Sequence, residues 1–379
     1  MADNKQNTNP NVPNLRFPEF KEVWKDSNIG KCFDLYSGNT PSRMEKEHFI
    51  GDVNWITSGE LKEHYIGDTK ERISEKAAAD NNLRILPVGT FVMAIYGLEA
   101  EGVRGTCSII VKTSTISQAC MAFTPKSNVS NEFLYSWYKK HGNKIGIRYA
   151  QGTKQQNLSY DIIEKFPIRY PSIEEQEKLN TFISLLDSRI ATQNKIIQQL
   201  QSLIKGIVVS VTAETPNTRI DKCLACHSST LQENQIEECG DFPVYGANGI
   251  CGYTVNADFN EPAILIVKDG SGVGNVRFVD GKYSVIGTQN ILTSQNRFFL
   301  KYIFYCLQAF NFVPYKTGMA IPHIYFKDYG KAKIYCPNFE QQVKIASQID
   351  LIESKIEIET QLLNKYEEQK KFLLSNMFI

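Results

Sequence analysis

The sequence of 379 residues lacks any apolar run close to the roughly 18–20 residues that a membrane-spanning helix needs. Its opening stretch, "MADNKQNTNPNVPNL", also lacks the apolar segment of a secretory signal. We therefore expect a soluble, cytoplasmic protein. The nine cysteines, an odd number scattered along the chain, favour reduced thiols over a disulfide framework. The net charge of only +1 argues against a generic polyanion binder.

Signatures of common catalytic sites are absent as well. The chain has no G-x-x-x-x-G-K-[ST] phosphate loop, no H-E-x-x-H metal motif, no G-x-S-x-G nucleophile and no Pro-Asp nuclease signature. It also lacks the Asn-Pro-Pro-aromatic motif of amino-methyltransferases, and no two of its five histidines have metal-ligand spacing. We therefore expect no catalytic residues and no cofactor in this chain.

Two short stretches imitate binding motifs. "CLACH" at 223–227 matches a haem-attachment signature, and Cys223 and Cys226 together with Cys239 and Cys251 offer four zinc ligands. Buried strand cysteines are the favoured interpretation, so we expect no metal, and a zinc- or thiol-dependent enzyme remains an alternative. "DGSGVGN" at 269–275 resembles a glycine-rich nucleotide loop, but a strand pattern follows it, which favours a β-hairpin or a close-approach loop.

An internal repeat organises the chain. At an offset of 166 residues, "PSIEEQEKL" at 171–179 matches "PNFEQQVKI" at 337–345, and the register holds without a gap for about 60 residues. Upstream the copies drift, and "NIGKCFDLYSGNTPS" at 28–42 resembles "RIDKCLACHSSTLQ" at 219–232. The chain therefore consists of two variable modules, each followed by a better-matched helix.

Each copy contains the signals of a long helix. Ser172 with Glu175 predicts a capping box, and Asn338 with Gln341 is its equivalent. Apolar residues then recur in a heptad seam, interrupted near the middle by a polar residue in each helix. The seams are Leu179, Ile183, Leu186 and Ile190 before Gln193, and Ile345, Ile349, Ile352 and Ile356 before Glu359. Two such seams in one chain predict an antiparallel coiled coil, in which Gln193 and Glu359 either meet or lie at the solvent edge.

The modules ahead of the helices are rich in short β patterns punctuated by glycine turns, such as "GTFVMAIYG" at 89–97 and "AILIVKDG" at 263–270. We predict an α+β protein with two globular domains, each built on a twisted, mainly antiparallel sheet, separated by two long helices with pseudo-twofold symmetry. The predicted ranges are an N-terminal arm at 1–27, partly disordered, a first globular domain at 28–170, a first long helix and linker at 171–214, a second globular domain at 215–336 and a second long helix at 337–379.

Positive charge gathers in two equivalent stretches. Residues 133–170 carry seven basic and two acidic side chains, and 299–336 carry five basic and one acidic. Interleaved tyrosines and a tryptophan are typical of a phosphate-contacting surface, although solvated faces of packed helices would explain the same charges.

This order of module, P-x-x-E-[EQ]-Q helix, module and helix resembles the DNA-sequence-specificity subunit of type I restriction-modification enzymes. "GNTPSR" at 38–43 and "FIGDVNWITSGELKE" at 49–63 are similar to the start of that family's target-recognition domain, as are "FPVYGANGICGY" at 242–253 and "VIGTQNILTS" at 285–294. The resemblance implies a non-catalytic subunit that reads a bipartite, asymmetric sequence of double-stranded DNA. It also implies two methyltransferase subunits and motor-nuclease restriction subunits as partners, which carry S-adenosylmethionine, ATP and Mg.

On that resemblance, DNA contacts are expected from polar loops beside the basic stretches, where Arg and Lys bind guanine or phosphate and Gln and Asn bind adenine. The candidates in the first module are Ser42, Arg43, Ser58, Tyr96, Arg104, Lys154, Gln155, Gln156 and Asn157. Those in the second are Tyr245, Asn248, Lys268, Ser271, Gln289, Asn290, Lys316 and His323. The competing hypothesis is a coiled-coil adaptor with two ligand-binding modules that does not act on DNA.

Overall fold

The computed structural model describes residues 9–97, 105–149, 156–236, 240–295, 297–319 and 321–379, and the chain divides into two compact units. The first unit comprises Met1–Thr192 and Leu363–Ile379, and the second comprises Gln193–Leu362. Each unit contains one sheet-rich module and parts of two long helices, α5 (Ile173–Thr212) and α9 (Phe339–Met377). Among the described residues, no helix combines the length and the apolarity that crossing a membrane requires.

The first module is built on a five-stranded sheet in the order β2-β10-β6-β8-β4, in which only β4 and β8 pair in parallel. Its strands are β2 (Phe33–Ser37), β10 (Cys120–Pro125), β6 (Phe91–Ala94), β8 (Cys107–Ile110) and β4 (Tyr65–Ile66). Strand β6 is buried on both faces: Phe91 and Met93 share a core with helix α3 (Asn131–Tyr149), whereas Val92 and Ala94 pack in a separate cluster. This explains why the sequence of β6 is continuously apolar rather than alternating.

Smaller elements complete the first module. A three-stranded sheet has the order β5-β3-β9, and two-stranded ladders join β1 to β12 and β7 to β11. Their bounds are β5 (Arg72–Ile73), β3 (Val53–Ile56), β9 (Ser114–Ile116), β1 (Lys25–Asn28), β12 (Pro167–Tyr170), β7 (Tyr96–Gly97) and β11 (Gln156–Asn157). The short helices are α1 (Ile29–Cys32), η1 (Lys46–Phe49), η2 (Ser58–Glu60), α2 (Glu75–Asp80) and α4 (Tyr160–Ile163).

The second module has a four-stranded antiparallel sheet in the order β14-β20-β17-β18 and a three-stranded sheet in the order β16-β15-β19. The strands are β14 (Leu224–Ser228), β20 (Gln289–Ser294), β17 (Ala263–Val267), β18 (Val276–Val279), β16 (Gly249–Thr254), β15 (Phe242–Gly246) and β19 (Ser284–Val285). The remaining elements are β13 (Thr218–Arg219), α6 (Ile220–Cys223), η3 (Glu233–Gln235), α7 (Leu300–Gln308), η4 (Val313–Tyr315), α8 (Phe326–Tyr329) and β21 (Lys333–Ile334).

Strand β17 is the counterpart of β6. Its five residues are all buried, Ile264 and Ile266 in the core shared with α7 and Ala263 and Leu265 in a second cluster. Strands β17 and β18 pair antiparallel around the glycine-rich stretch, which confirms the predicted hairpin. Gly274 has φ +92°, a conformation that favours glycine.

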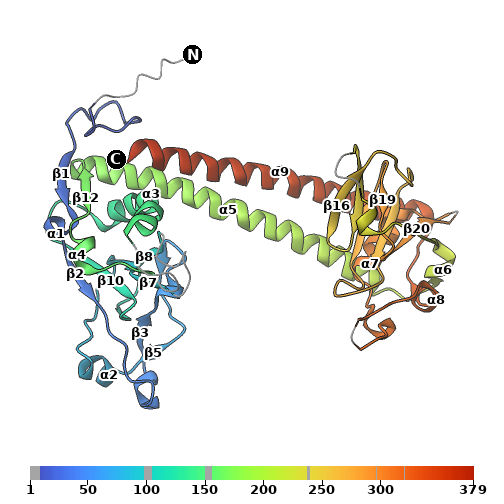
Figure 1. Ribbon diagram of the computed structural model, residues 1–379, viewed down its shortest axis with the longest axis horizontal. Coiled ribbons are helices and arrows are strands. Elements are labelled where there is room, and N and C mark those ends of the chain that lie inside the picture. The colour runs from blue at the N-terminus through green and yellow to red at the C-terminus, as the bar shows by residue number, and fades with distance from the viewer. Residues whose placement is uncertain (1–8, 98–104, 150–155, 237–239, 296, 320) are drawn as a thin grey trace. The chain divides into compact units, whose positions relative to one another are not determined.

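The two long helices pair antiparallel within each unit. In the first unit, Ile183 near the start of α5 shares a core with Leu373 and Met377 near the end of α9. Figure 1 shows the C-terminus beside the start of α5. In the second unit, Val208 near the end of α5 shares a core with Ile349 near the start of α9. The predicted fold class, α+β modules with an antiparallel pair of long helices, is confirmed.

The polar residues that interrupt the two seams meet inside the second unit. Gln193 Nε2 donates to the backbone oxygen of Glu359 at 3.1 Å and also to the Glu359 carboxylate. Lys355 forms an ion pair with the same carboxylate. The hydrogen bonds from Lys355 and then Gln193 lower the pKa of Glu359. Of the two positions that the sequence left open for this pair, the structure confirms the meeting in the seam.

Candidate nucleic-acid interface

The repeated glutamine of the P-x-x-E-[EQ]-Q motif joins each module to its helix. Gln176, the fourth residue of α5, is fully buried; its Oε1 accepts from Ser130 N at 2.9 Å, and its Nε2 donates to Asn128 O at 2.7 Å and Pro171 O at 3.1 Å. Ser130 and Asn128 lie just before α3, so two of these hydrogen bonds fix the start of α5 against the start of α3, and the third stays at the start of α5.

The second copy repeats this joint. Gln342, the fourth residue of α9, is 1 % exposed, accepts from Phe299 N at 2.9 Å and donates to Pro337 O at 2.8 Å. Phe299 immediately precedes α7, the counterpart of α3. Sequence reasoning noted that both glutamines recur but missed their role, although their recurrence in both copies was the signal.

The predicted capping box of α5 is half formed. Ser172 Oγ accepts from Glu175 N at 3.4 Å, but the Glu175 carboxylate is bound by Arg16 at 2.6 and 2.8 Å and by Trp24 Nε1 at 3.3 Å. The second bond of the predicted box, from the Ser172 backbone N–H to the Glu175 carboxylate, is therefore replaced, because Arg16 and Trp24 bind that carboxylate instead. At α9 the same half of the box is present, and Asn338 Oδ1 accepts from Gln341 N at 2.9 Å.

Of the candidate contact residues in the first module, Ser42 and Arg43 lie exposed in the loop after β2. Arg43 is held within the protein: its guanidinium donates to both carboxylate oxygens of Glu71 at 2.7 and 2.8 Å and lies 4.8 Å from the ring centre of Phe49. The hydrogen bonds raise the pKa of Arg43 and lower the pKa of Glu71. A base or phosphate would therefore compete with Glu71 for Arg43.

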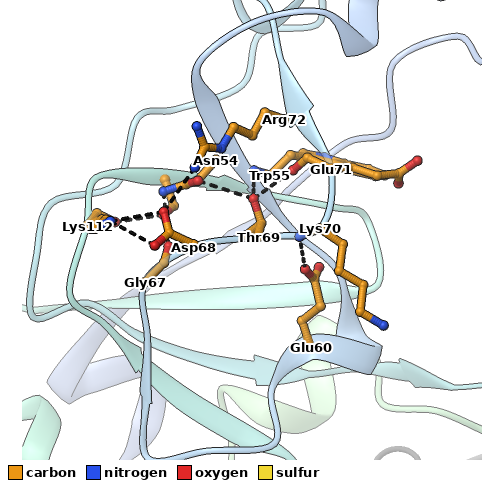
Figure 2. A network of polar contacts seen from close by, with 11 residues as sticks. Asn54, Trp55, Glu60, Gly67, Asp68, Thr69, Lys70, Glu71, Arg72 and Lys112 are labelled. Carbon is orange, nitrogen blue, oxygen red and sulfur yellow. Dashed lines mark hydrogen bonds and ion pairs between the residues drawn. The ribbon is translucent and has the colours of Figure 1, made fainter.

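Ser58 begins helix η2 beside a polar network that shapes this part of the module. Figure 2 shows the segment 67–72 tied to β3 and to Lys112: Asn54 donates to Gly67 O at 3.0 Å, and Lys112 Nζ binds the Asp68 carboxylate at 2.9 and 3.0 Å. Glu60 accepts from Lys70 N at 2.7 Å. The exposed Lys70 side chain points away from this network (Figure 2).

Tyr96 and Asn157 are brought together as direct partners in the ladder between β7 and β11, with Tyr96 half-buried and Asn157 exposed. Arg104, Lys154 and Gln155 lie outside the described residues. Gln156 has a described place in β11, but its side chain does not. Tyr96 and Asn157 therefore mark one edge of the first module where predicted contact residues meet.

In the second module the structure gathers predicted residues from two loops. The loop after β17, with Lys268 and Ser271, lies against the segment before α8, where Ile324 N donates to Lys268 O at 2.9 Å. His323 Nδ1 lies 2.6 Å from Asp269 Oδ1, so the histidine is held in place by a carboxylate. Lys316 is exposed next to the bridge between residues 317 and 323. Four of the eight predicted residues thus share one loop cluster.

The other four residues divide between the surface and the interior. Asn248 is exposed in the turn between β15 and β16, and Tyr245 is half-buried with the guanidinium of Arg277 5.9 Å from its ring centre. Gln289 and Asn290 are 1 % and 5 % exposed; Gln289 donates to Tyr245 O at 3.1 Å and Asn290 to the Tyr329 hydroxyl at 3.0 Å. In this conformation the last two side chains bind other parts of the module.

The two basic stretches serve mixed purposes. Lys139 donates to Gly105 O at 3.1 Å, and Lys140 donates to the carbonyls of Ser375 and Phe378 at the end of α9. Lys301 pairs with Asp350 at 3.3 Å. These lysines connect elements of the fold, whereas four others in the second stretch, Lys316, Lys327, Lys331 and Lys333, are exposed.

A stacked histidine links the first module to α5, and sequence reasoning missed it. The His64 ring lies between two parallel tyrosine rings, with ring centres 3.8 Å from Tyr135 and 4.1 Å from Tyr65. Its Nε2 is 3.0 Å from Glu132 Oε2, and its Nδ1 lies 3.8 Å from Asp187 Oδ2 on α5, within range of charge attraction. The cluster draws on three segments that are far apart in the chain, so no local sequence pattern indicates it.

The charges around His64 favour its protonated form. Burial lowers the pKa of His64, but the attraction of Asp187 and Glu132 outweighs burial and raises the pKa above its usual range. Asp187 also binds Lys370 of α9 at 2.5 Å. Burial raises the pKa of Asp187, and its contacts with His64 and Lys370 reverse this and lower it. His64 thus takes part in an ion-pair chain across both helices of the first unit.

The cysteines considered as zinc ligands, two from the "CLACH" stretch together with Cys239 and Cys251, do not form a described cluster. Cys223 is buried with its Sγ 3.8 Å from Cys336 Sγ, Cys226 is half-buried on β14, and Cys251 is exposed on β16. Cys239 lies outside the described residues. Within the described ranges, no group of three or more His, Cys, Asp or Glu side chains is arranged to hold a metal ion.

Comparison with known proteins gives matches that span both halves. The family model described as "Type I restriction modification DNA specificity domain" matches residues 21–202 and 226–368. The specificity subunit of the type I restriction enzyme MjaIX from Methanocaldococcus jannaschii is 31 % identical over 197 residues, which cover 48 % of this chain and 44 % of that protein. The EcoprrI specificity subunit from Escherichia coli is 21 % identical over 361 residues, which cover 85 % of this chain and 86 % of that protein.

Solved structures share the fold. The crystal structure of a type I restriction-modification system S subunit from M. genitalium superposes with a TM-score of 0.63 at 17 % identity, covering 97 % of this chain and 99 % of that one. A chain from a study of complex assembly and conformational transition of the type I system gives a TM-score of 0.61 at 12 % identity, covering 94 % and 97 %. At these identities the likeness concerns the fold alone.

Proposed function

Because the chain belongs to the family of type I restriction-modification DNA specificity subunits, we propose that it recognises a bipartite, asymmetric DNA sequence and carries no catalytic residues of its own. The observation that carries the proposal is the duplicated joint. Gln176 and Gln342 attach two modules of different surface chemistry to their helices in equivalent ways. Two modules of different sequence, attached to their helices in equivalent ways, suit a DNA target with two different halves.

In the second module the DNA contact is the loop cluster of Lys268, Ser271, Lys316 and His323, whose neighbouring backbone bridges hold it in one conformation before DNA arrives. Exposed Lys316 binds phosphate, and its neighbours approach base edges. In the first module the edge with Tyr96 and Asn157 serves the same purpose.

The chain docks two methyltransferase subunits, and restriction subunits join them. Exposed apolar residues recur at the repeat offset on the two long helices: Ile173 is 37 % exposed and Phe339 52 %, and Leu185 is 60 % exposed and Leu351 72 %. A twice-occurring apolar surface fits two copies of one partner. S-adenosylmethionine, ATP and Mg belong to these partners, and the complex works in the cytoplasm, where the DNA lies.

The decisive experiment maps methylated adenines across the genome with and without this gene, together with its methyltransferase. Loss of a two-part motif supports the proposal. An unchanged methylation pattern in a host whose methyltransferase is active refutes it and favours the coiled-coil adaptor.

Binding of duplex DNA by the assembled complex tests the loop cluster. Lys316→Ala should weaken binding to all sequences and lower the slope of log affinity against log salt by about 1, because one phosphate contact is lost. Lys195→Ala, which removes an exposed lysine from α5, is the control. An unchanged slope for Lys316→Ala would remove this residue from the interface.

Native mass spectrometry tests the docking surfaces. Leu185→Asp and Leu351→Asp should each reduce the complex to one bound methyltransferase, and the double variant should bind none. Ile85→Asp places the same charge on an apolar residue that is 54 % exposed but lies outside the helices. Two bound copies in all three single variants would contradict the assignment of these surfaces.

A further inference from the structure

A cavity of about 260 Å³ in the first unit is not explained by the proposed function. It is formed by α3 from Trp137 to Tyr149, by Phe166 and strand β12, and by Ile379. Trp137 and Phe166 contribute apolar walls, and Lys144, Arg148 and Arg169 contribute positive charge. Its lining includes no acidic side chain. A concave site with three basic side chains and aromatic walls is suited to an anion that has an apolar part.

Two buried nitrogen atoms on the lining residues have no hydrogen-bond partner among the described residues: His141 Nε2 and Arg169 Nε. The nearest carboxylate oxygen to Arg169 Nε, from Asp26, is 3.6 Å away, longer than a hydrogen bond. Native proteins rarely leave such groups unpaired, because the loss of water is then uncompensated. Ligand oxygens in the cavity would supply the missing partners.

Two of the three positive charges of the site also remain available, whereas Arg169 Nη1 donates to Pro10 O at 3.2 Å. Within the described part of the chain, ion pairs engage Arg169 but neither Lys144 nor Arg148, and both of these side chains are exposed at the cavity. Burial, followed by the charge of Lys140, lowers the pKa of His141 to about 4, so its ring is neutral near pH 7. A neutral ring can offer Nε2 either as a donor or as an acceptor.

We infer that this cavity binds a phosphate ester, with the phosphate near Lys144, Arg148 and Arg169 and the organic part against Trp137 and Phe166. The volume lies just below the roughly 300 Å³ at which small-molecule sites begin, which suits a ligand of about one nucleotide. Arginine favours phosphate because its planar fork donates two parallel hydrogen bonds. The ester comes either from a free nucleotide or from a DNA strand, and only the second source rests on the proposed function.

Titration of the full-length chain with AMP and with inorganic phosphate tests the inference, because Trp137 reports on the cavity. AMP should change the tryptophan fluorescence saturably, and Trp137→Phe should remove the signal while calorimetry still detects binding. Arg148→Gln with Lys144→Gln should weaken AMP binding about tenfold or more, since two charged contacts are lost. Lys76→Gln, which removes an exposed lysine from α2, should leave it unchanged.

Competition decides the source of the phosphate. If a DNA duplex displaces AMP, the site holds a strand phosphate; if it does not, the site holds a free nucleotide, and either result supports the inference. Absence of saturable binding up to about 10 mM AMP or phosphate, well beyond ordinary ligand affinities, overturns it. Equal weakening by Lys76→Gln also overturns it, because the charge effect would then be general. The methylation map does not depend on this outcome, so the two proposals fail separately.

Discussion

Replacing Gln176 by methionine tests the idea that one side chain fixes the start of α5 against its module. Methionine has a similar length but cannot replace the three hydrogen bonds to Ser130, Asn128 and Pro171. At about 1 kcal/mol for each lost hydrogen bond, Gln176→Met should destabilise the first unit by about 3 kcal/mol. Gln342→Met loses two such bonds and should cost the second unit about 2 kcal/mol.

Hydrogen exchange followed by mass spectrometry in increasing urea is the appropriate assay, because peptides from each unit report separately on a chain that need not unfold in one step. Protection should fall in the unit that carries the substitution and stay unchanged in the other. Gln198→Met, at an exposed position of α5, is the control and should cost less than about 0.5 kcal/mol. If Gln176→Met cost no more than this control, the joint would have no energetic role.

Three further outcomes follow from the structure. The raised pKa of His64 means that protonation favours the folded first unit, so the stability lost in His64→Gln should be largest below about pH 6 and should shrink as the pH rises through the folded pKa; a constant difference in urea unfolding would contradict this. Gln193→Leu alone should lower the melting temperature, because the buried Glu359 carboxylate loses one of its partners. The double variant Gln193→Leu with Glu359→Leu should restore the melting temperature, and a further loss of stability from the second substitution would argue against coupling between the two residues. Iodoacetamide should label exposed Cys251 before Cys107, whose pKa burial raises to about 12 and which should react only after unfolding. Mass spectrometry of the labelled peptides gives the order, and equal rates in the folded protein would contradict the burial of Cys107.

The features that could be predicted from the sequence are local or periodic. The helix starts at Asn338 and Ser172, the heptad seams and the hairpin around residues 269–275 depend on residues close together in the chain, and their patterns are visible in it. The match at an offset of 166 residues then implied two equivalent halves. These periodicities placed Gln193 and Glu359 near the middle of the two helices but left open whether they meet, and the structure shows that they do.

The features that the sequence hid depend on residues far apart in the chain. From the sequence, Arg43 is a candidate to bind DNA, yet in the structure Glu71 and Phe49 contact its guanidinium. Gln289 is of a residue type that binds adenine, yet its side chain donates to Tyr245 O within its own module.

The sequence by itself therefore determined which elements exist and that they occur twice, because propensity, capping and periodicity act over a few neighbouring residues. Only the tertiary structure decided which polar side chains are free to meet a ligand and which hold the fold together. That choice depends on distances between segments, as in the stack of His64 on Tyr135 and the cavity beside Trp137, and local sequence contains no record of those distances.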